Sequence, residues 1–326
     1  NLRQPMLKVA ALQLRTSADR TALIARAAAL IEEAAQRGAR VVCLPEAFTG
    51  LYGAKHFADN AEEWRCGAEA GTTLLAESAA KHGIFTCGGV IERHPISSKL
   101  FNTIAAFDPR GVEVARYRKI HLSRVSVGGV ATAEGDVLEA GDALSWFDVP
   151  AEVEDAGAAS PPASFRFGLA NCFDLRFAEL HTLLTRSPPE GVGAEVVLYP
   201  ASWLAATGEL GHWETLLTAR ALDAQCYVVG VSNARDEAHE TVAFGRSCIV
   251  GPMGDRLAVC DDDAADEVVI AELSLSALVE ARQRIPLRSA RRPLVYADAL
   301  RAQQHDPRAM GRAPPEWSGE NPSRQN

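Results

Sequence analysis

The chain has 326 residues, 47% hydrophobic and 23% charged, which is ordinary globular composition and excludes a disordered, collagen-like or coiled-coil chain. The formal net charge of −9 argues against a protein that binds nucleic acid by general electrostatics. No uninterrupted apolar run approaches the roughly 20 residues of a membrane helix, so we expect neither a nucleic-acid nor a membrane partner.

The N-terminal region has the pattern of a strand, a helix and a second strand. A buried strand is expected over 7–14, a helix over 18–37 and a strand over 40–44, which together form a βαβ unit. Six apolar residues of the helix follow the 3.6-residue period: Leu23, Ile24, Ala27, Leu30, Ile31 and Ala34. Gly38 stands where a helix C-terminal cap belongs.

The rest of the chain repeats this pattern and adds hairpins. Helix candidates precede strand candidates in three places: 70–82 before 84–91, 175–186 before 195–199, and 212–224 before 226–231. A strand over 165–170 precedes the second of these helices. Two hairpins are expected where a short turn separates strand-like runs: 102–108 with 112–117, and 247–252 with 256–260. Two mixed sheets, each covered by helices, account for this order.

Nothing marks a linker between two domains, so we expect one domain over 1–302. The segment 150–164 is low in large apolar residues and is expected to be a surface insertion. From 303 to 326 the chain is polar with scattered Pro and Gly, and a C-terminal tail is expected there.

The cysteines argue for a reducing compartment. Seven are present, an odd number with wide spacing and no CxxC pair, which disfavours a disulfide framework and a structural zinc site. No signal-peptide pattern is visible after Asn1. We expect a cytoplasmic protein, or a mitochondrial one if a targeting segment precedes Asn1.

Three reactive side chains directly follow predicted strands. Glu46 comes after the strand in VVCLPEAF, Lys119 after the hairpin strand in RYRKIHL, and Cys172 at a strand-to-helix turn in FRFGLANCFDLRF. Ligands bind at the carboxyl ends of strands in α/β sheets. A thiol at a helix start is also expected to be stabilised as the thiolate.

Each of the three residues also has a plainer interpretation. Taken alone, Glu46 is a solvated loop residue, Lys119 part of a basic surface turn, and Cys172 a buried structural thiol. The three motifs in this order, however, make the sequence resemble the nitrilase superfamily of carbon–nitrogen hydrolases over about 1–300. Longer stretches resemble its omega-amidase branch: YGAKHF at 52–57, RFAEL at 176–180, TGELGHWE at 207–214 and RQRIP at 282–286. Phe173 and Ala224 depart from that branch, which usually has Tyr and Asn there.

The resemblance implies a four-layer αββα sandwich and a thiol amidohydrolase without metal or cofactor. Cys172 is implied as the nucleophile, Glu46 as the general base and Lys119 as the oxyanion-stabilising cation. The backbone N–H of Phe173 is implied as a second oxyanion donor. Glu134 in ATAEGD aligns with a second family glutamate that holds the lysine and orients substrate; without the resemblance it is a loop carboxylate.

The omega-amidase branch cleaves the terminal amide of short dicarboxylic monoamides such as 2-oxoglutaramate and 2-oxosuccinamate. Such a substrate carries a free carboxylate, which needs a cation if it is buried. Arg176 lies four residues after Cys172, about one helical turn on, and is our candidate, unless it pairs with Glu179 instead. Tyr52 is a candidate hydroxyl donor.

Other assignments remain open from the sequence. Within the superfamily these are a carbamoyl-amine hydrolase and a deaminated-glutathione amidase; outside enzymes, a catalytically idle scaffold relative. The family also implies a homodimer or larger homo-oligomer formed through one helical face. His121 is expected to be structural, because Glu46 already fills the role of base.

Overall fold

The computed structural model describes residues 6–65, 67, 70–151 and 163–296. The chain divides into two compact units, Asn1–Gln283 and Arg284–Asn326. The first holds both large sheets, and the described part of the second includes the short helix α8 (Leu287–Ala290). The predicted domain end at 302 lies outside the described residues and stays a prediction. In the described part of the chain, no helix is long and apolar enough to cross a membrane.

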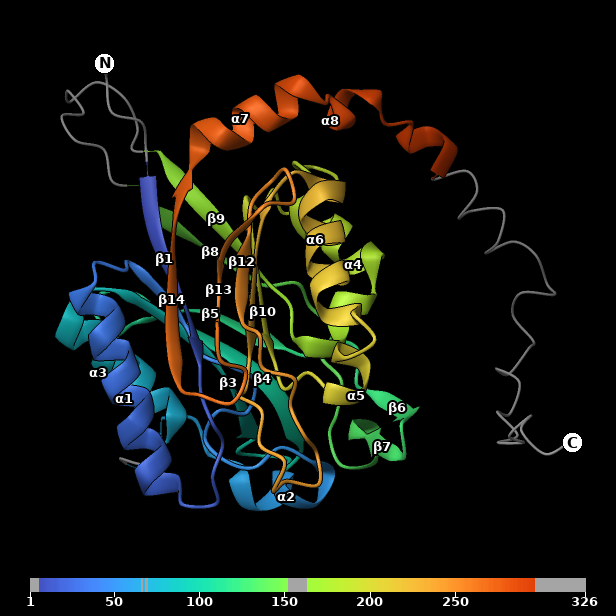
Figure 1. The fold of residues 1–326 in the computed structure, drawn as a ribbon. Helices are drawn as coiled ribbons and strands as arrows, with labels where there is room; N and C mark the ends of the chain where they lie inside the picture. Colours follow the sequence, from blue (N-terminus) through green and yellow to red (C-terminus); the bar gives the residue numbers. More distant parts are fainter. Residues whose placement is uncertain (1–5, 66, 68–69, 152–162, 297–326) are drawn as a thin grey trace, which may run out of the picture. The chain divides into compact units, whose positions relative to one another are not determined.

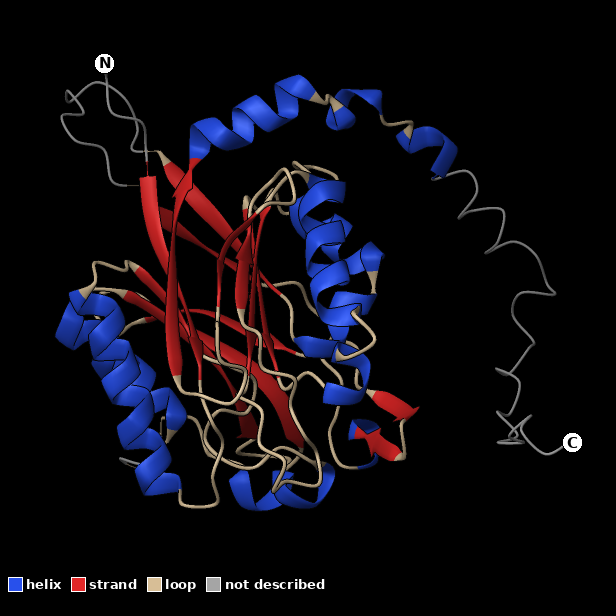
Figure 2. Cartoon of the chain, viewed as in Figure 1, coloured by secondary structure: helices blue, strands red, loops and turns tan. Residues whose placement is uncertain are grey.

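Two six-stranded mixed sheets form the centre of the first unit (Figures 1 and 2). The strands of the first sheet are, in spatial order, β14 (Glu267–Ser274), β1 (Met6–Gln13), β2 (Val41–Cys43), β3 (Phe85–Arg93), β4 (Leu100–Phe107) and β5 (Glu113–Arg118). Those of the second are β13 (Arg256–Val259), β12 (Cys248–Val250), β11 (Tyr227–Ser232), β10 (Val196–Ala201), β9 (Ser164–Leu169) and β8 (Trp146–Pro150). Each sheet has three parallel strands, β1-β2-β3 and β9-β10-β11, with antiparallel strands outside them.

Helices cover the outer face of each sheet. The longer α-helices are α1 (Arg20–Gln36), α3 (Gly71–His82), α4 (Ala178–Thr185), α6 (His212–Ala224) and α7 (Leu275–Arg284). Shorter elements are α2 (Ala54–Asn60), α5 (Ala205–Gly208), the 3₁₀ helices η1 (Glu134–Asp136) and η2 (Cys172–Arg176), and the hairpin β6 (Arg124–Val127) with β7 (Val130–Ala133). Helices α1 and α3 lie on the first sheet, and α4 and α6 on the second (Figure 1).

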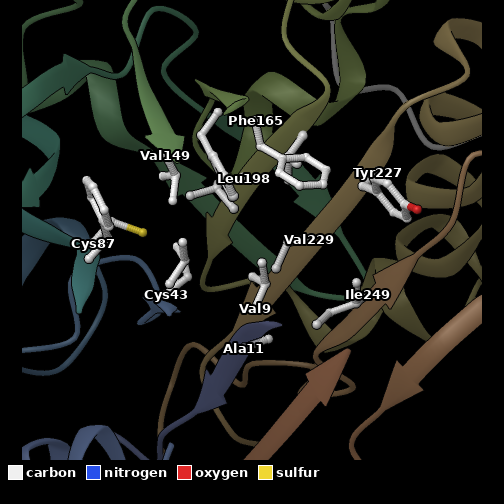
Figure 3. Close-up of a cluster of buried hydrophobic side chains, with 14 of the residues drawn as sticks. Val9, Ala11, Cys43, Cys87, Val149, Phe165, Leu198, Tyr227, Val229 and Ile249 are labelled. Atoms are coloured by element: carbon white, nitrogen blue, oxygen red, sulfur yellow. The ribbon is translucent and has the colours of Figure 1, made fainter. Parts of the chain in front are cut away.

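The alternation of side chains along each strand produces the four layers. On β1, Val9 and Ala11 face the second sheet, whereas Ala10 and Leu12 pack with α1 and α3. The inter-sheet core takes residues from both sheets, as Figure 3 shows for Val9 of β1 and its neighbours from β2, β3 and β8 to β12. The predicted αββα sandwich of two mixed sheets is therefore confirmed.

Most predicted elements are present with ends shifted by a few residues, and two expectations need correction. The predicted helix over 175–186 is instead a five-residue 3₁₀ helix, η2, followed by α4. The predicted insertion over 150–164 begins and ends in a strand pair, because Pro150 of β8 is the register partner of Ser164 in β9. Residues 152–162 lie outside the described part of the chain.

Candidate active site

The three reactive residues come together where strands of the two sheets end. Glu46 lies in the loop after β2, and Lys119 lies directly after β5. Cys172 comes three residues after Leu169, the end of β9, and is the first residue of η2. Glu46 and Lys119 are both fully buried, and Cys172 is 7% exposed. Burial excludes the solvated-loop and surface-turn interpretations of Glu46 and Lys119.

Lys119 is held between two carboxylates. Its Nζ lies 2.8 Å from Glu46 Oε1 and 2.9 Å from Glu134 Oε2. Glu134, at the start of η1, is 2% exposed. The predicted contact between Glu134 and Lys119 is thus present, and a loop carboxylate in solvent is excluded.

Other polar groups fix the orientation of both carboxylates. Asn102 of β4 donates from Nδ2 to Glu46 Oε1 at 2.7 Å and to Glu134 Oε1 at 3.0 Å. The Tyr52 hydroxyl donates to Glu134 Oε1 at 3.0 Å. The backbone N–H of Ser202 donates to Glu46 Oε2 at 2.8 Å, and that of Ser123 to Glu134 Oε2 at 2.6 Å. Each carboxylate therefore has one preferred position.

The two glutamates have opposite pKa shifts. Burial raises the pKa of Glu46, and the neighbouring Glu134 charge adds to this against the attraction of Lys119. For Glu134 burial acts in the same direction but is outweighed by Lys119 and the Ser123 N–H, so its pKa is lowered. Burial also disfavours the Lys119 cation, yet both carboxylates together raise its pKa well above the usual value. Of the two carboxylates, Glu46 is therefore the one that takes up a proton more readily, beside a lysine whose charge both carboxylates favour.

The nucleophile candidate stands on a strained turn. Cys172 has φ +48°, a left-handed backbone conformation that is uncommon for a residue with a Cβ. The fully buried Asp174 anchors this turn. It accepts hydrogen bonds from the Tyr117 hydroxyl at 2.7 Å, the Asn171 N–H at 2.9 Å and the His121 N–H at 3.0 Å, and it lies 2.7 Å from His121 Nδ1. His121 thus holds the turn, as expected of a structural residue.

The expectation of a stabilised thiolate is wrong. Burial raises the pKa of the Cys172 thiol well above its usual value, and the charge of Glu46 raises it further, against a smaller effect of Lys119. A helix start favours a thiolate, but here burial and the charge of Glu46 outweigh that effect. A thiol with a raised pKa needs a base to remove its proton, and Glu46 is its neighbour.

A small pocket opens at Cys172. Its lining residues are Tyr52, Ser123, Val125, Thr132, Cys172, Phe173, Arg176, Ser202, Trp203, Leu204 and Thr207. The predicted substrate-binding residues Tyr52, Phe173 and Arg176 therefore all line it. A wider pocket, bordered by Lys55, His56 and Glu240, shares Tyr52, Thr132 and Ser202 with the small one. Among the residues that the structure describes, no group of three or more His, Cys, Asp or Glu is arranged to hold a metal ion.

Arg176 forms part of the pocket wall without a carboxylate partner among the described residues, so the alternative of an ion pair with Glu179 does not hold. Its guanidinium carbon lies 4.6 Å from the centre of the Trp203 ring, and its Nη1 lies 3.3 Å from His212 Nδ1. Burial lowers its pKa from the usual value. The predicted helical-turn geometry is wrong, since residues 172–176 form a 3₁₀ helix, but the predicted position beside Cys172 is correct.

Several site residues were missed by the sequence analysis. Asn102 was assigned to a hairpin strand, and Ser123, Ser202 and Trp203 were not singled out. Ser123 and Ser202 contribute backbone N–H groups, which leave no signal in a sequence. Asn102, the first residue of NTIAAFD, also carries no recognisable sequence signal, because only the sheet register shows which face of the strand its side chain occupies.

Gly89 of β3 packs directly against the loop that carries Glu46. Its backbone bonds to Pro45 and Phe48, and an added Cβ would lie 2.7 Å from Glu46 Cα. We expect Gly89→Ala to displace the loop, to lower the free energy of unfolding by about 1–3 kcal/mol and to reduce amidase activity. Chemical denaturation and ammonia release measure the two effects. Gly135→Ala is the control, because a Cβ added there would have its nearest neighbouring atom 3.9 Å away. Equal losses of stability and activity in the two variants would contradict the proposed close contact between Gly89 and the Glu46 loop.

Comparisons with known proteins identify the family of this chain. The model of the carbon–nitrogen hydrolase family matches residues 8–283. Omega-amidase NIT2 of Homo sapiens is 38% identical over 291 residues, covering 89% of this chain and 96% of the relative. The NIT2 protein of Xenopus tropicalis is 38% identical over 273 residues, covering 83% and 90%.

A solved structure gives the same answer for the fold. The crystal structure of Saccharomyces cerevisiae Nit3, a member of branch 10 of the nitrilase superfamily, matches with a TM-score of 0.73 at 30% identity. That match covers 88% of this chain and 96% of Nit3. With a family model over most of the chain and relatives at this identity, the chain belongs to the carbon–nitrogen hydrolases of the nitrilase superfamily and is an enzyme that acts on amides.

Proposed function

We propose that this amidase is an omega-amidase that hydrolyses the terminal amide of short dicarboxylic monoamides, such as 2-oxoglutaramate and 2-oxosuccinamate, to acid and ammonia. The observation that carries the proposal is the placement of Arg176, a cation without a carboxylate partner among the described residues, in the same small pocket as Cys172. A guanidinium can bind the free carboxylate bidentately while the amide carbon lies at the thiol. The likeness to the NIT2 omega-amidases supports the same substrate class.

In the first half of the proposed reaction, Cys172 Sγ attacks the amide carbon and its proton passes to Glu46. The negative charge that develops on the amide oxygen is stabilised by Lys119 and by the backbone N–H of Phe173. Glu46 then gives the proton to the nitrogen as the C–N bond breaks. Ammonia leaves, and the acyl group remains on Cys172 as a thioester.

In the second half, Glu46 takes a proton from a water molecule, and the resulting hydroxide adds to the thioester carbon. The C–S bond breaks, the thiolate recovers the proton from Glu46, and the acid product leaves. The raised pKa of Glu46 suits it to accept and return a proton in both halves. Glu134 keeps its charge throughout and holds Lys119 in place.

Ammonia release from 2-oxosuccinamate, 2-oxoglutaramate and N-carbamoyl-β-alanine tests the substrate class. Turnover of the two oxo-amides is expected. Turnover of the carbamoyl compound alone would overturn the omega-amidase proposal while leaving the amidase chemistry intact. Turnover of none of the three would also overturn the omega-amidase proposal, and would favour a deaminated-glutathione amidase or a catalytically idle relative.

The role of Arg176 gives a sharper prediction. Arg176→Met keeps an unbranched, flexible side-chain stem but removes the charge and the guanidinium donors. We expect kcat/KM for succinamate to fall about 10- to 100-fold, because a hydrogen bond to a charged group is worth about 1.5–3 kcal/mol. Butyramide has a methyl group in place of the carboxylate, and its kcat/KM should change little.

The matched control is Arg110→Met, at an exposed arginine that binds Asp108 and is not among the residues lining the pocket. It should leave both substrates unaffected. Equal losses on succinamate and butyramide in the Arg176 variant would mean that Arg176 supports the pocket without binding the carboxylate.

A further inference from the structure

We propose that the Trp203 indole N–H is a second donor to the free carboxylate of the substrate, beside Arg176. The inference rests on the proposed function and adds a specificity-determining residue to it. It follows from three observations: a buried donor with no acceptor among the described residues, the position of its side chain in the pocket wall, and the packing of the ring against the guanidinium.

The first observation is the hydrogen-bonding state of Trp203. The side chain is 2% exposed, and its Nε1 has no acceptor among the described residues. Buried indole N–H groups usually find a partner. Trp213 donates to the Arg246 carbonyl at 2.9 Å, and Trp64 donates to Glu113 Oε2 at 2.7 Å. Trp203 is thus unlike these two, and a buried donor without an acceptor is unfavourable unless a ligand supplies one.

The second and third observations place the Trp203 side chain in the pocket wall beside Arg176. Trp203 lines the same pocket as Cys172 and Arg176. The Arg176 guanidinium carbon lies 4.6 Å from the centre of the Trp203 ring, within the range of a cation–π contact. The ring is itself packed against Trp213, with centroids 5.1 Å apart, which limits its movement. The indole ring is therefore the direct neighbour of the guanidinium to which the proposed function assigns the carboxylate.

The chemistry of the ligand fits this pair of donors. A carboxylate has two oxygens and about four lone-pair positions, more than one guanidinium edge fills. Arg176 Nη1 already contacts His212, which leaves fewer of its donors for substrate. An indole N–H can only donate, so it favours an acceptor such as a carboxylate oxygen over a methyl group of the same size. Trp203 thereby separates dicarboxylic monoamides from simple aliphatic amides.

The test is Trp203→Phe in the full-length enzyme, assayed with succinamate, 2-oxosuccinamate and butyramide. Phenylalanine keeps an aromatic ring against Arg176 and removes the N–H. We expect kcat/KM for both acids to fall about 10-fold or more, mainly through KM, with butyramide changed less than about two-fold. The butyramide measurement corrects for lost packing, since both substrate types occupy the altered pocket.

Trp64→Phe is the matched control, because it removes an indole N–H that already has a partner and lies outside the pocket lining. Replacing Trp203 by benzothienylalanine, which keeps the ring shape and lacks the N–H, should reproduce the kinetics of the Phe variant.

An equal loss of kcat/KM on all three substrates, or a loss confined to the 2-oxo acid, would overturn the inference. If Arg176→Met separates the acids from butyramide and Trp203→Phe does not, the inference alone fails. If neither variant does, both residues lose their proposed role in binding the carboxylate, and ammonia release from the oxo-amides by the wild-type enzyme decides whether the substrate class fails as well.

Discussion

Cys172→Ala is expected to abolish amide hydrolysis, with kcat reduced on the order of 10⁵-fold or more, as is typical when a catalytic nucleophile is removed. Without Sγ no thioester forms, and the remaining groups offer only oxyanion stabilisation and substrate binding. Ammonia release from 2-oxosuccinamate measures the loss. Mass spectrometry of the wild-type enzyme quenched during turnover should detect the acyl adduct on the peptide containing Cys172, and the variant should lack it.

The control for this prediction is Cys260→Ala. Cys260 is a fully buried thiol in the core between the two sheets, and it is not among the pocket-lining residues. Its replacement leaves a small cavity and is expected to lower stability while kcat stays within about two-fold of wild type. More than about 1% residual activity in the Cys172 variant, at an unchanged thermal midpoint, would show that hydrolysis proceeds without this nucleophile.

The fold was largely predictable because its strands and helices have strong local patterns. The period of α1 and the Gly-containing turn between β4 and β5 are both short-range signals, and both elements formed. The strand β14 was missed, although it pairs with β1 along its whole length. Its place beside β1 depends on a contact across most of the chain, which periodicity cannot show.

For the site, the positions of the reactive residues were predictable from the sequence, but their ionisation was not. The positions of Glu46, Lys119 and Cys172 followed from motifs after strands. The structure brings the three side chains together, with Cys172 in the wall of the small pocket and the other two fully buried. The ionisation of Cys172 did not follow, because it depends on burial and on the charge of Glu46, 126 positions earlier by residue number. The lack of an acceptor for Trp203 Nε1 within the described part of the chain is likewise a property of the packed structure. Self-association through a helical face and the cellular compartment stay predictions.

Glu46→Gln separates two effects of the same carboxylate. Glutamine is nearly isosteric and can still accept the bonds of Asn102 and Lys119, but it cannot remove a proton. General acid–base catalysis contributes about 10²–10⁴-fold per group, and Glu46 acts in both halves of the proposed reaction. We therefore expect kcat/KM to fall about 10⁴-fold. The acid limb of the pH profile should also disappear, since in the wild type it reports protonation of Glu46, whose pKa lies above the usual carboxyl value.

The same substitution should make the thiol easier to ionise. The Glu46 charge raises the pKa of Cys172, so a neutral side chain at position 46 lowers that pKa while Lys119 continues to favour the thiolate. The pH at which iodoacetamide alkylates Cys172 at half its maximal rate should therefore shift downward, even though hydrolysis is lost. Because unfolding or a displaced pocket would not produce these opposite changes together, the pair of measurements tests Glu46 as a base in contact with the thiol. An upward shift of the alkylation profile would contradict that assignment.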